Sequence, residues 1–381
     1  MVKTEVLAQI IDKIRQLVIM INDTDVIALR YVIMNKGKKS KSAAAPRRAT
    51  SRDVARLAGV SQSSVCRVFD ERWTSKISPA LREKVLATAR ELGYCPNAIA
   101  RSLTAQRSGI IGVIISEDFN EFYYDIMRRI TNGLQELSMR VMLFNAAPYR
   151  DVKQVLRSLV EYRVDGIIVT AAAISTVAEA TLQEVPVPLV LVNIYSRTPF
   201  CSSVICDNYA GSQNMAAYLI RSGGRRFAYI SAENSKYYDI SDRREGFLSG
   251  LRQNGIQDCI MECGDYTYES GKAAARRLLD RPDRPDTIFS CGSRMAYGVM
   301  DVARYEYGLK IPEDLSVAAY DDTFASALDS YRLTTVQQPS QELSRTAIRL
   351  IRQEIEGPAP IETVYAVPSL EIRDSVRRPN Q

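Results

Sequence analysis

The chain has 381 residues, 46% of them hydrophobic, so it is long enough to bury the cores of two or three domains. It contains no histidine, which excludes Ser-His-Asp and Cys-His catalytic systems and most catalytic zinc sites. The net charge of +6 is unevenly distributed along the chain. Residues 34–107 carry 16 basic and 5 acidic side chains, whereas residues 108–381 carry 30 basic and 35 acidic side chains. This distribution indicates a basic segment that binds a polyanion, followed by a nearly neutral remainder of the chain.

Residues 1–48 combine an apolar stretch with a basic one. The stretch "VLAQIIDKIRQLVIMI" has hydrophobic residues at helical spacing, but its longest aliphatic run, residues 17–21, is far too short to span a membrane. No cleavage site typical of a secretory signal follows it, so we expect a cytoplasmic protein without a membrane contact. We expect residues 1–48 to be an N-terminal extension and basic linker. The alternative is that translation begins at Met34.

Residues 50–59 carry the start and stop signals of a short helix. Thr50 and Asp53 fit a capping box, and Gly59 ends the helix. We expect its buried face to consist of Val54, Ala55, Leu57 and Ala58.

A second helix is predicted directly after this glycine turn. Ser61 is expected to cap it, its two valines to face inward, and its outer side to carry Gln62, Ser63, Ser64 and Arg67. Such a helix pair is a helix-turn-helix, and short outer side chains let the second helix approach base edges in the DNA major groove. A third helix, from Ser78-Pro79 to Gly93, would brace the pair.

The cysteines show no pattern of their own. They are seven in number, which is odd, and they contain no CxxC pair, so neither a disulfide framework nor a zinc site is indicated. We expect buried free thiols, no metal and no cofactor.

The motifs "DVARLAGVS", "VCRVFD" and "ISPALREKVLATARELGYCPNAIARSL" resemble the headpiece of the LacI/GalR family of bacterial transcription regulators. The resemblance continues in "IGVIISEDFNEFYY", "VDGIIV", "VICDNYAGSQNMAAYLI", "GRRFAYI", "RREGFLSGL", "GDYTYESG", "PEDLSVAAYDD" and "LTTVQQPS", and it covers about residues 49–375. It implies a DNA-binding domain over residues 49–94 and a hinge helix with linker over residues 95–108.

The resemblance also implies the DNA contacts. Gln62 and Ser63 match the residues that read bases, and Arg67 matches an arginine that grips a base or phosphate. Leu103 matches a leucine wedge in the minor groove, with a core leucine as the alternative. The full expected set is Thr50, Ser61, Gln62, Ser63, Ser64, Arg67, Asn97, Ala100, Arg101 and Leu103. The chain departs from the family at Cys66 and Asp70, where serine and asparagine are usual, and either Asp70 turns away from the phosphates or the operator contact is altered.

From residue 109 onward, short apolar runs alternate with helical stretches. Such alternation predicts parallel sheets covered by helices, with the apolar strands buried on both faces. The expected strands lie in residues 109–115, 141–146, 164–170, 188–193, 227–231, 286–291 and 316–321. Ligands of such sheets bind beyond the carboxyl ends of the strands, here in a cleft between two sheets.

The resemblance implies a two-lobed periplasmic-binding-protein-like core. Its crossovers are expected near residues 207, 338 and 358. The first lobe would comprise about 109–207 and 339–357, and the second about 208–337 and 358–381. The fold class is therefore an all-α helix-turn-helix headpiece plus an α/β two-lobed core with parallel sheets.

Residues that follow the strands are the candidate effector contacts. Aromatic faces suit a sugar or base, and arginine and aspartate suit hydroxyls or a carboxylate. The expected set is Phe122, Tyr123, Asn193, Arg243, Tyr266, Ser293 and Asp321. The family's usual Asn-Asp pair is Gly292-Ser293 here, and its usual Asp-Arg pair is Asn193-Ile194. We therefore expect either an effector with fewer hydroxyls than a typical sugar or a weak response to small molecules.

Together these features predict a repressor of the LacI type, without enzymatic activity. Its partners would be double-stranded operator DNA with a pseudo-palindromic sequence, a sugar-like effector and a second copy of the chain, with a tetramer as the alternative. Two rival classes are a solute-binding component of a transporter and a two-lobed enzyme. The first would lack residues 49–103, and the second would need a phosphate loop or an acid-base set that the sequence does not contain.

Overall fold

A computed structural model describes residues 49–95, 107–116, 121–146, 152–170, 182–195, 199–232 and 238–379. The chain divides into two compact units, Met1–Asn97 and Ala98–Gln381. The expectations for residues 1–48 and for Asn97, Ala100, Arg101 and Leu103 lie outside the described residues. In the described part, every helix is too short or too polar to cross a membrane.

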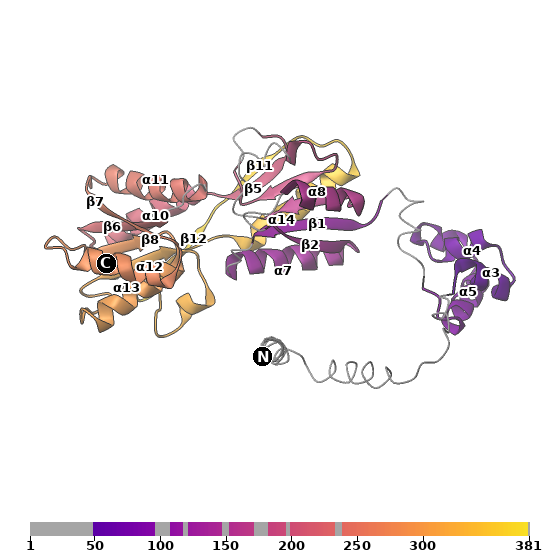
Figure 1. The fold of residues 1–381 in the computed structure, drawn as a ribbon, viewed down its shortest axis with the longest axis horizontal. Helices are drawn as coiled ribbons and strands as arrows, with labels where there is room; N and C mark the ends of the chain where they lie inside the picture. Colours follow the sequence, from indigo (N-terminus) through magenta and orange to yellow (C-terminus); the bar gives the residue numbers. More distant parts are fainter. Residues whose placement is uncertain are drawn as a thin grey trace, which may run out of the picture. The chain divides into compact units, whose positions relative to one another are not determined.

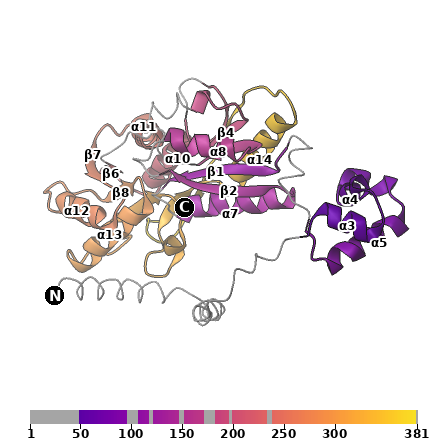
Figure 2. The same ribbon diagram turned by 45° about the vertical axis from the view of Figure 1, so that its right-hand side comes forward.

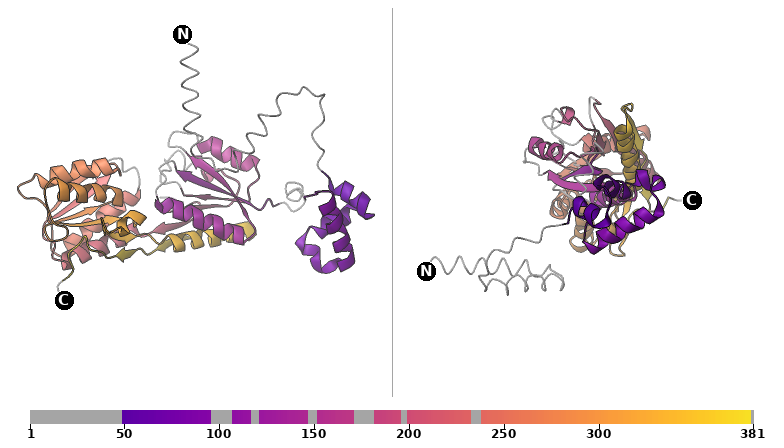
Figure 3. Two further views of the ribbon diagram at one scale, coloured as in Figure 1. Left: turned by 90° about the horizontal axis from the view of Figure 1, so that it is seen from below. Right: turned by 90° about the vertical axis from the view of Figure 1, so that its right-hand side faces the viewer.

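The first unit is helical over its described residues, and Figure 3 shows its helices from two sides. It contains α3 (Ser51–Ala58), α4 (Gln62–Val68), the 3-10 helix η2 (Glu71–Lys76) and α5 (Pro79–Glu91). These α-helices share one apolar cluster, to which α4 contributes Val65 and Val68. This small core holds α4 against the other two helices and leaves its polar side outward.

The predicted helix signals of this unit are confirmed. Thr50 and Asp53 form a reciprocal capping box, in which the Thr50 amide donates to Asp53 Oδ2 at 3.0 Å. Ser61 Oγ accepts from the Ser64 amide at 3.1 Å, and Gly59 adopts a left-handed φ of 62°. The burial of Leu57 was wrongly predicted, because its side chain is 54% exposed. Each residue of an α-helix is rotated by about 100° around the helix axis from the one before it. Leu57 therefore lies roughly 100° around the axis from the centre of the buried face, which consists of Val54, Ala55 and Ala58.

The second unit contains two six-stranded sheets, seen side-on in Figure 1. The first has the order β11-β5-β4-β3-β1-β2 and is parallel throughout. Its strands are β1 (Ile110–Ser116), β2 (Arg140–Ala146), β3 (Gly166–Val169), β4 (Leu189–Val192), β5 (Ser202–Cys206) and β11 (Thr363–Ala366).

The second sheet has the order β12-β10-β9-β8-β6-β7. Its strands pair in parallel except for β12, which is antiparallel to β10. They are β6 (Phe227–Ala232), β7 (Cys259–Gly264), β8 (Thr287–Ser290), β9 (Ser316–Tyr320), β10 (Thr334–Gln337) and β12 (Ser369–Glu371). Each predicted strand segment of the two sheets contains a strand.

Helices cover both faces of the first sheet. Alternate strand residues point to opposite faces, so Ile111 and Val113 pack with α7 (Glu121–Glu136) and α14 (Ser340–Glu356), whereas Ile114 packs with α8 (Val152–Glu161). Figures 1 and 2 show α7 running beside β1 and β2.

The second sheet is covered in the same way. Figure 1 shows α10 (Asn208–Arg221) and α11 (Tyr238–Gln253) on one face, with α12 (Tyr268–Leu279) and α13 (Ser293–Tyr305) on the other. The last two helices approach each other closely at Gly298, where a Cβ atom would lie 2.3 Å from the Tyr268 carbonyl oxygen. This tight packing fixes the position of the turn that precedes α13.

Three expectations about this unit need correction. The segment 358–381 does not belong to the second lobe throughout, because β11 pairs with β5 of the first sheet and the chain crosses over only after Ala366. The segment 141–146 is not buried on both faces, because β2 is an edge strand on which Leu143 is 48% exposed. The seven cysteines form no disulfide, but their expected burial fails for Cys66, Cys95 and Cys263, which are exposed.

Candidate nucleic-acid interface and candidate effector site

The outer face of α4 presents short polar side chains. Gln62, Ser63 and Arg67 are exposed, and Ser64 is half-buried. The Gln62 side chain is held against α3, because its Nε2 donates to Ser51 Oγ at 3.0 Å and its Oε1 accepts from Arg52 Nε at 3.3 Å. The amide is therefore oriented before any ligand binds, and an amide that can both donate and accept is suited to the edge of an adenine.

Arg67 is positioned by an aromatic ring. Its guanidinium carbon lies 4.6 Å from the ring centroid of Trp73, and Lys76 Nζ lies 5.3 Å from the same centroid. Trp73 is the only tryptophan of the chain. Two cations on one ring concentrate positive charge at the end of α4, where a cation-π contact limits the conformations of the exposed arginine.

Two of the expected DNA contacts use their hydroxyls for capping. Thr50 Oγ1 donates to Asp53 Oδ2 at 2.7 Å, and Ser61 Oγ lies 2.8 Å from the hydroxyls of both Ser63 and Ser64. Asp70 is half-buried after α4, and its amide donates to the Arg67 carbonyl at 3.1 Å.

A chain of buried hydrogen bonds joins the two sheets of the second unit. The Cys206 amide donates to Asn193 Oδ1 at 3.1 Å, and Asn193 Nδ2 donates to Gln338 Oε1 at 2.9 Å. Gln338 Nε2 in turn donates to Asp321 Oδ1 at 2.6 Å. Asn193 follows β4, Asp321 follows β9 and Gln338 follows β10, so the chain runs between the carboxyl ends of strands in different sheets. We call these three residues, with Arg243 and Asn208, the inter-sheet network.

Arg243 of α11 supplies the positive charge of the network. Its side chain is 3% exposed, and its Nη1 lies 2.9 Å from the Cys291 carbonyl oxygen and 3.4 Å from Asp321 Oδ2. Its Nε donates to Asn208 Oδ1 at 3.0 Å, and its guanidinium lies 3.9 Å from the Tyr320 ring centroid. A charge this deeply buried requires such partners, so removing one of them would leave the other uncompensated.

The thiol and phenol beside this network are neutral. Burial raises the pKa of Cys206 to about 12 and raises the pKa of Tyr320 well above its ordinary value. Cys206 Sγ and the Tyr320 hydroxyl lie 3.8 Å apart. Neither group can act as a base or nucleophile at neutral pH, which fits a binding site better than a catalytic one.

Tyr266 and Ser293 lie next to the network. The Tyr266 ring packs on Gly292, where a Cβ atom would lie 2.8 Å from the ring, and Ser293 is the first residue of α13 and is buried. The preceding Cys291 carbonyl accepts the bond from Arg243, so this turn connects both residues to the network. Tyr266, Asn193 and Asp321 all have left-handed φ values, of 67°, 57° and 70°. This backbone strain is typical of ligand sites.

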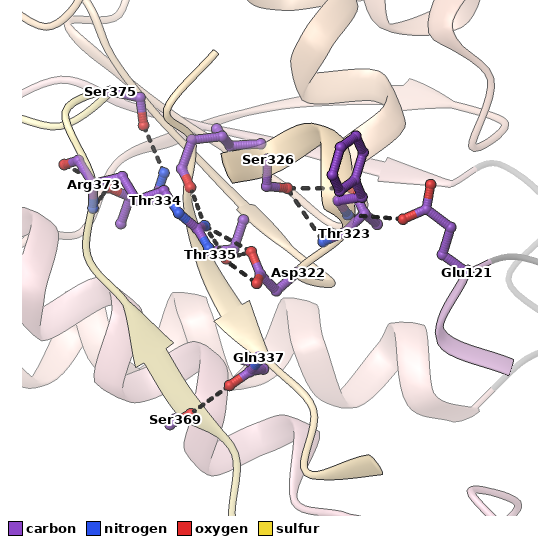
Figure 4. Close-up of polar contacts among 12 residues, drawn as sticks. Glu121, Asp322, Thr323, Ser326, Thr334, Thr335, Gln337, Ser369, Arg373 and Ser375 are labelled. Carbon is purple, nitrogen blue, oxygen red and sulfur yellow. Dashed lines mark hydrogen bonds and ion pairs between the residues drawn. The ribbon is translucent and has the colours of Figure 1, made fainter. Parts of the chain in front are cut away.

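Phe122 and Tyr123 occupy a different environment. They lie in the first turn of α7, and their rings, 5.1 Å apart, are buried in the apolar core beside the first sheet. The preceding residue, Glu121, contacts a segment beside the second sheet. Its Oε2, drawn in Figure 4, accepts a hydrogen bond from the Phe324 amide at 2.8 Å. The structure therefore brings five of the seven expected effector contacts together and places these two aromatic rings in the core.

A second ion pair supports the turn that carries Asp321. Arg373 binds Asp322 through two parallel bonds, with Nη1 2.6 Å from Oδ1 and Nη2 3.0 Å from Oδ2 (Figure 4). The Thr335 hydroxyl also donates to Asp322 Oδ1, at 2.7 Å. Both charged side chains are largely buried, at 16% and 14% exposed. We call Asp322 and Arg373 the clamp pair, because together they fix the backbone after β9.

Sequence reasoning missed Gln338, Asn208 and the clamp pair. Gln338 and Asn208 follow β10 and β5, two short strands without the continuous apolar run that marked the others. A polar residue just beyond a strand of a parallel sheet is the signal that would have found them. Within the described residues, no cluster of acidic residues and cysteines could hold a metal ion.

Comparison with known proteins decides the family. Residues 50–97 match the description "Bacterial regulatory proteins, lacI family", and residues 216–376 match "Periplasmic binding protein-like domain". Catabolite control protein A of Priestia megaterium is 31% identical over 329 residues, which cover 85% of this chain and 98% of the relative. The chain belongs to the LacI family. Its predicted fold class and its assignment to the transcriptional regulators, rather than to the enzymes, are thereby confirmed.

Two further LacI-family proteins agree with this assignment. The ribose operon repressor of Escherichia coli (strain K12) is 33% identical over 317 residues, which cover 81% of this chain and 94% of that protein. A crystal structure of the lac repressor dimer bound to operator and the anti-inducer ONPF superposes with a TM-score of 0.78 at 28% identity, covering 86% of this chain and 99% of that one. Both names are those of repressors, and the lac repressor structure is one bound to its operator.

Proposed function

We propose that the protein is a repressor that binds a pseudo-palindromic operator as a homodimer and responds to a small metabolite at the inter-sheet network. The lac repressor structure that it resembles is a dimer on its operator with a small molecule bound. Two copies would place two α4 helices on two half-sites. The domain bounds 49–94 and 95–108 and the wedge role of Leu103 remain predictions.

The exposed face of α4 carries the DNA half of this proposal. Gln62 and Ser63 would read base edges, and Arg67 would bind a guanine or a phosphate. The excess of 16 basic over 5 acidic residues in segment 34–107 supports it, because phosphate contacts supply most of the affinity for DNA.

The proposal of effector binding is based on the chain of hydrogen bonds from Asn193 through Gln338 to Asp321. It is the observation that links both sheets through polar atoms at their carboxyl ends. A ligand that competes for these bonds would bind one relative position of the sheets better than another, and only such a difference can shift a conformational equilibrium. Arg243, Tyr266 and Ser293 complete the proposed contact set, and Phe122 and Tyr123 support it only indirectly, as part of the apolar core beside the first sheet.

The DNA half is tested by mapping the genomic sites that the protein occupies and then measuring its affinity for a mapped duplex at moderate salt. We expect binding at least 1,000-fold tighter than to a scrambled duplex of equal length, the lower end of specific recognition. Equal affinity for both duplexes would overturn the proposal.

The effector half is tested with metabolites of the genes beside the mapped sites. Asp321→Asn keeps the shape of the carboxylate but removes its charge, and we expect the metabolite concentration needed for half-maximal response to rise about ten-fold or more. Asp329→Asn is the control, because Asp329 is fully exposed in the same part of the chain. An unchanged response of the Asp321 variant would remove that residue from the site.

A further inference from the structure

One indole ring of the helix-turn-helix unit contacts two cations. The Arg67 guanidinium carbon lies 4.6 Å from the centroid of the Trp73 ring, and Lys76 Nζ lies 5.3 Å from the same centroid. Both cationic side chains are exposed, whereas Trp73 is half-buried. We call these three residues the indole cluster. It contains Lys76, which is not among the DNA contacts expected from the sequence.

Neither cation of the indole cluster forms an ion pair with an acidic side chain among the described residues. Elsewhere in the same unit, by contrast, Arg56 Nη2 lies 3.2 Å from Asp53 Oδ1. Two like charges held near one ring repel each other, and the negative face of the ring offsets this repulsion only in part. The two cations are therefore available to an anionic ligand.

The 3-10 helix η2 determines where the ring lies. This helix follows α4 in the chain, and within the turn that leads into it the Trp73 amide donates to the Asp70 carbonyl at 3.0 Å. In helix-turn-helix proteins the first residues of the second helix contact base edges. Arg67 lies in the last turn of α4. The contact with Trp73 therefore holds the Arg67 side chain near η2, at the end of α4 opposite to the one that approaches the bases.

The combination of an arginine with a lysine on one ring selects the ligand. A guanine edge can accept two hydrogen bonds from one arginine, but its acceptor atoms are neutral, and the nearby ammonium would stay unpaired. A DNA strand instead offers a negatively charged phosphate at every nucleotide, so both cations find an acceptor there. The indole contact also limits the conformations of Arg67, which lowers the entropic cost of holding its side chain on a phosphate.

We propose that Trp73 is a positioning residue, which holds Arg67 and Lys76 together as a clamp on neighbouring phosphates of one DNA strand. Lys76 is then a DNA contact in addition to those of the proposed function. Arg67 contributes to the affinity for every duplex and does not read a guanine. This inference rests on the proposed function, because it assigns a task within the same DNA-binding surface.

The phosphate contacts are tested by measuring the affinity of the full-length protein for a mapped operator and for a scrambled duplex over a series of salt concentrations. We expect Lys76→Gln to weaken the binding of both duplexes by a similar factor. The slope of log affinity against log salt concentration should become shallower by about 1, the contribution of one phosphate contact. Arg90→Gln is the matched control, because it removes the same charge from the exposed surface of α5 and should leave the slope unchanged.

The positioning role is tested with two substitutions of the ring. Trp73→Leu removes the aromatic face but keeps an apolar side chain, and we expect it to weaken the binding of both duplexes about three-fold. Trp73→Phe keeps an aromatic face and should lose less affinity. Lys76→Gln should weaken binding less in the Trp73→Leu background than in the parent, because the lysine is no longer held in place there. Independent, multiplicative losses in this double variant would show that the ring has only a structural role.

A measurement without DNA keeps the ring intact. Trp73 is the only tryptophan, so the indole emission of the free protein reports on this cluster alone. We expect Arg67→Ala and Lys76→Gln each to shift the emission, because both remove a charge that contacts the ring, whereas Arg90→Gln should not. Unchanged emission in both variants would overturn the cluster even if Trp73→Leu failed to fold.

The outcomes separate the clamp from the proposed function. Specific operator binding with an unchanged salt slope in Lys76→Gln overturns the clamp and leaves the proposed function. A loss in Trp73→Leu for the operator alone also overturns the clamp, because it would assign Arg67 to a base. Equal affinity of the parent for the operator and the scrambled duplex overturns the proposed function, while the salt slopes of the variants still decide on the clamp.

Discussion

Glu121, at the start of α7, accepts the backbone hydrogen bond of Phe324, 2.8 Å away at the start of a 3-10 helix beside the second sheet. The two residues are 203 positions apart in the chain. Because α7 packs on the first sheet and the 3-10 helix lies beside the second, this hydrogen bond depends on the relative position of the two sheets.

We predict that Glu121→Ala accelerates hydrogen exchange of the Phe324 amide about five-fold, the change that corresponds to ~1 kcal/mol of hydrogen bonding. Exchange measured by NMR or by mass spectrometry of short peptides would show it. Glu136→Ala, at the exposed other end of α7, is the control. Equal exchange in the parent and in Glu121→Ala would mean that the bond does not persist in solution.

The clamp pair gives a prediction about stability. Arg373→Ala leaves the Asp322 carboxylate, 14% exposed, without its two-bond partner. Breaking a largely buried ion pair from one side is costly, so we expect the free energy of unfolding to fall by about 2–3 kcal/mol. Urea denaturation measures it. Arg378→Ala, which removes an arginine that is 85% exposed, should change it by less than about 0.5 kcal/mol. A loss equal to that of this control would contradict a structural role for the pair.

The helix-turn-helix could be predicted from sequence because its signals are local. Thr50, Ser61 and Ser78 each cap the helix that follows, and Gly59 supplies the left-handed residue that ends α3. Each signal needs only neighbours within a few residues, so no tertiary information is required. The burial of Leu57 was wrongly predicted because the edge of a helix's buried face depends on which other helices pack against it.

The inter-sheet network could be predicted only in part. Arg243 and Asp321 carry charge and match effector contacts of the family, whereas Gln338, whose amide joins Asn193 to Asp321, is uncharged and lies in the motif "LTTVQQPS" without an expected effector role. The crossover after Ala366 was also missed. Strand β11 has only four residues, Thr363–Ala366, and it is added to a sheet whose other strands precede it by more than 150 positions. Such a pairing depends on the whole sheet rather than on local pattern.

Trp73 offers an intrinsic probe of DNA binding. As the only tryptophan, it reports the contact with Arg67, 4.6 Å from its ring, without labelling. We predict that a mapped operator changes the emission of the parent and that Arg67→Ala weakens operator binding by about 1–3 kcal/mol, or roughly 5- to 150-fold. Arg90→Ala, on exposed α5 surface, is the control. Unchanged affinity in Arg67→Ala would remove this arginine from the interface.

The cysteines should separate into two reactive classes. Thiolates are the reacting species, and burial raises the pKa of Cys206 to about 12, whereas Cys66 and Cys263 are exposed. We predict that iodoacetamide at about pH 8 labels the exposed cysteines of the native protein and spares Cys206 and Cys291, as read by mass spectrometry of peptides. Labelling after denaturation in urea gives the reference signal for complete modification of every cysteine. Native labelling of Cys206 at the rate of Cys263 would contradict the packing beneath the network.

Asp125 connects stability to pH. Its carboxylate joins α7 to α14, since Oδ2 lies 2.6 Å from both Arg129 Nε and the Ser340 hydroxyl and Oδ1 lies 2.6 Å from Arg128. Burial acts to raise the pKa of Asp125, but the bonds from Arg129, Ser340 and Arg128 outweigh it and lower the pKa below the ordinary 3.8.

A pKa that is lower in the folded state than in the unfolded state stabilises the fold above the ordinary pKa, and this contribution is lost as the pH falls through the lowered value. We therefore predict that Asp125→Asn is less stable than the parent by a constant amount between about pH 5 and pH 7 and that the difference shrinks below about pH 4. Urea unfolding across this range measures it, with the exposed Asp258→Asn as the control. A difference that stays constant down to about pH 3 would show that the bonds to Asp125 do not depend on its charge.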